Sequence, residues 1–170
     1  MTWPNRFLAF FREIEKHFSV ILQAEGCREG WLQGEFFRHF RENGVQVNYP
    51  GLDRAKHDLY CKLPSEMLVE IKVYVDDIRG TEIKRFVRSK GGDPLSHADI
   101  LNLDPPNGSY LRDVLRLMER PTPPDERYMI LVLPKEGDRA ISGLHVVARE
   151  HETEENFGTF RVRISRIQGI

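Results

Sequence analysis

The sequence has little cysteine, no long apolar run and no excess of charge of one sign. Its two cysteines, Cys27 and Cys61, show no metal-ligand spacing, so neither a disulfide scaffold nor a zinc site is expected. No stretch reaches the roughly 18 consecutive apolar residues that a membrane-spanning helix needs. These absences predict a cytoplasmic protein with reduced thiols and no membrane partner.

The length and the net charge restrict the possible domain organisation and the possible ligands. The 170 residues are enough for one domain, covering 1–170, with a substantial apolar core. The chain has 25 basic and 26 acidic side chains and a net charge of −1. Since there is no global basic excess, any binding of nucleic acid has to come from a local basic patch.

Two short apolar runs form the most informative part of the chain. Residues 57–63 and 67–74 are rich in Leu, Val, Ile and Tyr, and the connection at 64–66 contains Pro and Ser. This pattern predicts two antiparallel strands joined as a hairpin. In the second strand, alternate apolar residues are expected to point to a core.

The hairpin is expected to bring three charged side chains together. Glu70 and Lys72 are two residues apart, so they share one face of the second strand. If the strands pair with Cys61 opposite Met67, Asp58 lies beside Glu70 and Lys72. A shift of the register by one residue would move Asp58 to the opposite face.

Two carboxylates and a lysine suit metal-assisted attack on a phosphodiester. Mg²⁺ or Mn²⁺ takes one or two carboxylates and leaves other positions for water and phosphate oxygens. Lys72 is expected to orient the attacking water or to stabilise developing charge. A positive neighbour and partial burial are expected to lower the pKa of Lys72 toward the range of a general base.

Asp58, eleven intervening residues and then Glu70-Ile71-Lys72 resemble the catalytic signature of the PD-(D/E)XK nuclease superfamily. Members often add a glutamate on a helix before the hairpin, and Glu35 occupies the corresponding place. His57 stands where the family has the proline of its name. The resemblance covers residues 31–75.

The resemblance implies a restriction-endonuclease-like α/β fold, with a mixed central β-sheet flanked by helices. It also implies a magnesium- or manganese-dependent hydrolase that cleaves nucleic acid, with a DNA endonuclease favoured. Asp58, Glu70 and Glu35 would then hold the metal, and Lys72 would complete the catalytic set.

The same residues permit other interpretations. The three charges fit a solvated strand face with a cross-strand ion pair. Glu35 fits an ion pair with Arg38, one helical turn later, as well as it fits a site. The fold also suits a non-catalytic immunity or assembly module that binds a protein. A homodimer or a partner subunit is compatible with either function, because the chain shows no appended recognition domain.

A basic cluster follows the hairpin. The spacing of apolar residues over 78–87 predicts a helix, and its polar positions carry the residues that we expect to bind a phosphate backbone, Lys84, Arg85, Arg88 and Lys90. The alternative is a solvated helix face with cations placed near its C-terminus.

The remaining pattern predicts further helices and strands. Helices are expected over 29–43, ending at Gly44, and after Ser109, which is expected to cap the helix. A first strand is expected at 45–49 and a central one, covered on both faces, at 128–133. The alternating run at 157–164 predicts an edge strand. The acidic segment 150–155 is expected to lie away from any nucleic-acid cleft.

Overall fold

A computed structural model describes residues 2–24, 26–50, 56–74, 95–120, 124, 126–135 and 149–170. The helices are α1 (Trp3–Ile21), α2 (Arg28–Phe40), the 3₁₀ helix η1 (Arg41–Asn43), α4 (His97–Asn102) and α5 (Tyr110–Glu119). The strands are β1 (Gln46–Pro50), β2 (Lys56–Cys61), β3 (Met67–Val73), β4 (Glu126–Pro134), β5 (Arg149–Asn156) and β6 (Phe160–Ile167).

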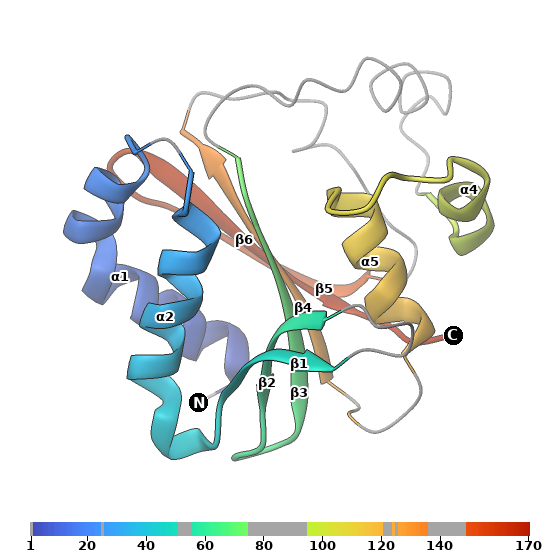
Figure 1. Cartoon of the computed structure of the whole chain (residues 1–170), viewed down its shortest axis with the longest axis horizontal. Coiled ribbons are helices and arrows are strands. Elements are labelled where there is room, and N and C mark those ends of the chain that lie inside the picture. The colour runs from blue at the N-terminus through green and yellow to red at the C-terminus, as the bar shows by residue number, and fades with distance from the viewer. Residues whose placement is uncertain are drawn as a thin grey trace.

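The strands form one mixed sheet in the order β1-β2-β3-β4-β6-β5. β3 and β4 run parallel, and every other neighbouring pair is antiparallel. Parallel neighbours need a crossover connection, and α5 lies in the stretch of chain between them. Helices α1 and α2 cover one face of the sheet, and α5 lies on the other (Figure 1). The α/β class and the mixed sheet flanked by helices are therefore confirmed.

The face under α1 and α2 holds a core rich in phenylalanine. Phe36 of α2 is fully buried, with its ring stacked 4.2 Å from that of Phe10 and in contact with the rings of Phe7, Phe11 and Phe40. Alternate residues of β3 and β4 complete this core from the sheet. Helix pairs of this kind are stable because their apolar stripes are removed from water together.

The opposite face carries a second core beneath α5. Leu68 of β3 and Leu131 of β4 pack there against Leu115 and other apolar residues of α5. Since side chains alternate along a strand, the residues of β3 that follow Leu68 on this face are Glu70 and Lys72. Two charged side chains are thereby directed toward α5.

Several expectations about local structure are confirmed. The hairpin forms, and Cys61 lies opposite Met67 in the register. Gly44 follows η1 with a φ of +67°, the left-handed conformation that ends a helix. The hydroxyl of Ser109 accepts a hydrogen bond from the backbone N–H of Arg112 and so caps α5.

The expected edge strand at 157–164 is wrong, because β6 lies between β4 and β5. The acidic segment forms the edge strand β5 in its place. Arg163 of β6 donates to Glu154, at 2.9 Å, and lies 3.6 Å from Glu152. These cross-strand ion pairs favour pairing in a sequence that has low intrinsic preference for a strand.

In the described part of the chain, no helix combines the length and the apolar character that crossing a bilayer requires.

Replacing Phe36 by Ala should lower the free energy of unfolding by about 3–5 kcal/mol, because the cavity it leaves is lined by rigid rings. The matched control is Phe37→Ala, the next residue on α2, whose side chain is 49% exposed. That change should cost no more than about 0.5 kcal/mol. Urea unfolding followed by circular dichroism measures both. Equal losses in the two variants would contradict this description of the core.

Candidate functional site

The two strands of the hairpin separate at one end. Their pairing runs from Cys61↔Met67 to Leu59↔Val69, although β3 continues to Val73. Beyond that point two carboxylates bind the backbone N–H groups of β3. Asp58 Oδ2 accepts from the N–H of Ile71 at 2.6 Å, and Glu29 Oε1 of α2 accepts from that of Val73 at 3.0 Å.

Glu70 lies at the centre of this opening and is completely buried. Its Oε1 is 2.7 Å from Nδ1 of His57, and its Oε2 accepts from Nη2 of Arg116 at 3.0 Å. The negative charge of Glu70 also acts on the carboxyl group of Asp58 and raises its pKa. Asp58 Oδ1 accepts from Gln33 Nε2 of α2 at 2.7 Å.

The charges continue toward α5. Nη2 of Arg116 also donates to Asp113 Oδ1, at 2.7 Å. The other oxygen of Asp113 is 3.1 Å from Nζ of Lys72, which in turn is 3.5 Å from Glu29. We call this connected set the fork cluster, and its members are Glu29, His57, Asp58, Glu70, Lys72, Asp113 and Arg116.

Burial and repulsion raise the pKa values of the central carboxyl groups. The pKa of Asp58 is raised to about 7, mainly by burial and next by the negative charge of Glu70. Burial also raises the pKa of Glu70 to about 7, against the opposing effect of Arg116. Asp113 has a raised pKa for the same leading reason. These groups therefore lose their protons less readily than ordinary carboxyl groups.

The expectation that Lys72 has a lowered pKa is wrong. Burial alone would lower the pKa of its ammonium group, but the carboxylates of Asp113 and Glu29 outweigh that effect and raise it. Lys72 therefore stays protonated at neutral pH. It suits the role of a cationic hydrogen-bond donor, not that of a general base.

The fork cluster carries an excess of negative charge. Among the described residues it contains four carboxyl groups and two permanent cations, so full ionisation leaves two negative charges uncompensated. A divalent cation would remove that excess, and Asp58 and Glu70 supply the hard oxygen donors that Mg²⁺ and Mn²⁺ prefer.

The described residues contain no group of three or more acidic, histidine or cysteine side chains arranged to hold a metal ion. Mg²⁺ commonly binds through one or two carboxylates and completes its coordination with water and substrate phosphates. A metal site at Asp58 and Glu70 would have to be of that kind, and the four oxygens of the pair already contact Gln33, Ile71, His57 and Arg116.

Three of the four predicted catalytic residues lie together. Asp58, Glu70 and Lys72 belong to the fork cluster, as the hairpin register implied. The structure does not bring Glu35 to them. Its Oε2 accepts two hydrogen bonds from Arg38, at 2.9 and 2.8 Å, which is the ion pair that the sequence left as an alternative.

The position of Glu35 on α2 explains this outcome. Gln33 reaches Asp58, and residues two apart on a helix point about 200° away from each other. Glu29 lies one turn before Gln33 and therefore shares its direction. The glutamate that α2 contributes to the site is Glu29, which the sequence did not single out.

Asp113 was also missed, and Arg116 was expected only to extend a basic surface together with Arg112 and Arg120, not to belong to the site. The sequence did contain a signal for Asp113, because it is a charged residue inside an apolar stripe of α5 and is itself buried. Its partner Lys72, however, lies on β3 and could not be identified without the tertiary structure. The predicted phosphate-binding residues Lys84, Arg85, Arg88 and Lys90 lie outside the described residues.

In comparisons with known proteins, the chain matches no protein-family model, no curated protein and no solved structure at a significant level.

The raised pKa values predict how stability depends on pH. In the unfolded chain a carboxyl group titrates near pH ~4, whereas in the folded protein Asp58 titrates at about 7. The folded state therefore binds more protons between these values, and the contribution of Asp58 to stability falls as the pH rises through this window. Asp58→Asn removes that effect, so the free energy of unfolding of the variant relative to wild type should rise with pH through this window, by at most about 4 kcal/mol.

Urea unfolding at several pH values measures this difference. Glu35→Gln is the matched control, since it neutralises a carboxylate outside the fork cluster, and its effect should not grow with pH. Asn cannot accept both hydrogen bonds that Asp58 accepts, so the variant loses some stability at every pH. A stability relative to wild type that does not rise with pH would contradict the raised pKa.

Proposed function

We propose that the protein is a metal-dependent nuclease of the PD-(D/E)XK type that hydrolyses phosphodiester bonds in nucleic acid. The observation that carries the proposal is the opening between β2 and β3, where Asp58 and Glu70 are close enough for the negative charge of Glu70 to raise the pKa of Asp58. Lys72 shares the face of β3 that carries Glu70 and is linked to it through Asp113 and Arg116.

The order of elements supports the same class. A helix, a strand, a hairpin and further helices precede a parallel strand in the centre of the sheet, from α2 to β4. This is the order expected of the restriction-endonuclease-like fold. From the same resemblance we infer DNA as the substrate and internal cleavage as the reaction.

In the proposed reaction Asp58 and Glu70 would hold Mg²⁺ or Mn²⁺. Such a cation would supply positive charge at the scissile phosphate and make water a better nucleophile. Each carboxylate is held in place by its own contacts, Asp58 by Gln33 and Ile71 and Glu70 by Arg116. This preorganisation avoids rearrangement during the reaction.

Lys72 would donate hydrogen bonds to the attacking water or to a phosphate oxygen. Its ammonium group carries three donors and stays charged, because Asp113 and Glu29 raise its pKa. Asp113 fixes the position of this ammonium group from α5, at 3.1 Å. Asp113 is therefore a positioning residue in this proposal.

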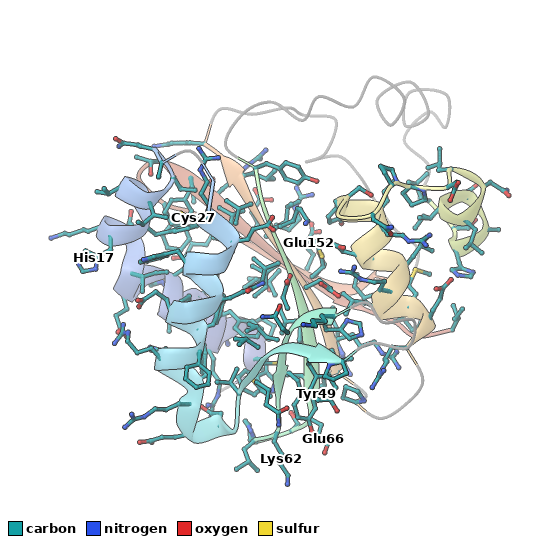
Figure 2. All side chains as sticks on the ribbon, in the orientation of Figure 1. His17, Cys27, Tyr49, Lys62, Glu66 and Glu152 are labelled. Carbon is teal, nitrogen blue, oxygen red and sulfur yellow. The ribbon has the colours of Figure 1, made fainter. Side chains whose placement is uncertain are left out.

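The test is cleavage of plasmid and linear duplex DNA in the presence of Mg²⁺ or Mn²⁺, followed on gels. Lys72→Met should lower the cleavage rate by about 100-fold or more, as expected when a donor to the transition state is removed. The control is Lys62→Met, because Lys62 lies exposed on the hairpin turn and points away from the body of the molecule (Figure 2).

The control variant should cleave at the wild-type rate. Circular dichroism spectra must show that both variants are folded. Undiminished cleavage by folded Lys72→Met protein would contradict the assignment of Lys72 to the reaction.

A further inference from the structure

His57 of β2 reaches across the opening of the hairpin to Glu70 of β3. It lies beyond the last pair that joins the two strands, Leu59↔Val69, and its backbone is paired with Tyr49 of β1 on the other side. Nδ1 of its ring is 2.7 Å from Oε1 of Glu70. The contact between these side chains therefore joins β2 to β3 where the strands have already separated.

Both partners of this contact are shielded from water. The side chain of His57 is 3% exposed, and that of Glu70 is fully buried. A buried hydrogen bond is electrostatically stronger than an exposed one, and water cannot readily replace a partner that is removed. Oε1 of Glu70 thus depends on His57 for its hydrogen bond.

A bound cation determines which atom of this pair carries the hydrogen. Glu70 has to be ionised in order to bind a metal ion, and an ionised carboxylate only accepts hydrogen bonds. Nδ1 of His57 must then carry the hydrogen and donate it to Oε1. The separation of 2.7 Å is in the range of such charge-assisted hydrogen bonds.

The two oxygens of Glu70 are held by donors from different elements. Nη2 of Arg116, on α5, donates to Oε2 at 3.0 Å, and His57 contacts Oε1 from β2. The last torsion angle of a glutamate has a broad distribution, so the side chain alone does not fix the plane of its carboxylate. A donor on each oxygen fixes that plane. Each oxygen keeps further acceptor capacity that a cation can use.

From these contacts we propose that His57 is a positioning residue, whose Nδ1–H fixes the carboxylate plane of Glu70 for metal binding. It acts through Glu70 and contacts neither the cation nor the substrate. This inference rests on the proposed nuclease function. It adds a residue that the resemblance does not supply, because the family has a proline at this place.

The test compares two substitutions of His57 that differ in one donor. Asn can place an amide N–H close to the position of Nδ1, whereas Leu has a similar branched shape and no donor. Calorimetry measures the Mn²⁺ affinity of each variant, and gels measure kcat and KM for a DNA duplex at saturating Mg²⁺. The matched control is His39→Leu. Nδ1 of His39 also lies near a glutamate, 3.4 Å from Oε2 of Glu13, but outside the fork cluster.

His57→Leu should bind Mn²⁺ about 10- to 100-fold more weakly, the loss typical of removing a hydrogen bond to a metal ligand. Its kcat should also fall, while its KM for the duplex should not change because His57 does not contact the substrate. His57→Asn should recover most of the affinity and of kcat. His39→Leu should match wild type in every measurement.

A measurement on the wild-type protein needs no variant. In protein with isotope-labelled histidine and saturating Mg²⁺, nuclear magnetic resonance identifies the ring nitrogen of His57 that carries a hydrogen. The proposal predicts a hydrogen on Nδ1, because an ionised Glu70 can only accept.

Three results would each overturn the role of His57: wild-type Mn²⁺ affinity in folded His57→Leu, equal losses in folded His57→Leu and His57→Asn, or an Nδ1 without a hydrogen. In each of them the wild-type protein still binds the metal ion, so the proposed function stands. Failure of the wild-type protein to bind Mn²⁺ is a different result, because it would contradict the proposed function and the role of His57 together.

Discussion

The separation of β2 from β3 is the constraint on which the site depends. A strand that loses its neighbour exposes backbone N–H groups, and these must find other acceptors when they are shielded from water. Asp58 and Glu29 provide those acceptors at Ile71 and Val73. The backbone thus holds two carboxylates at the opening, and Glu70 projects from the same strand toward them. The N–H groups of Ile71 and Val73 therefore have acceptors although β2 no longer pairs with this part of β3.

The clustering of acidic side chains at this opening lowers the stability of the folded protein. Buried carboxyl groups that repel one another lose solvation and gain little in return, as the raised pKa values of Asp58 and Glu70 indicate. Arg116 and Lys72 compensate part of the charge. The aromatic core beneath α1 and α2 offsets the rest, because its burial is independent of charge and pH. A local loss of stability within an otherwise stable fold is typical of a functional site.

The hairpin could be predicted because its information is local: strand period fixes which residues share a face, and a short turn restricts the register. This local information alone predicted that Asp58, Glu70 and Lys72 lie together. The rotation of α2 about its own axis was harder to predict. Glu29 and Glu35 are both acidic, and only the packing of the helix decides which of them faces β3. Asp113 and Arg116 come from a distant helix. The strand β5 depends on arginines of β6, so its own composition was misleading.

The most direct test of the proposed metal site is calorimetric titration of the protein with Mn²⁺ at slightly alkaline pH, where Asp58 and Glu70 are more fully ionised. The wild-type protein should bind the ion, and Asp58→Asn and Glu70→Gln should each abolish binding while Glu35→Gln retains it. Absence of binding to the folded wild-type protein, or equal binding by all four proteins, would contradict a metal site at the opening between β2 and β3.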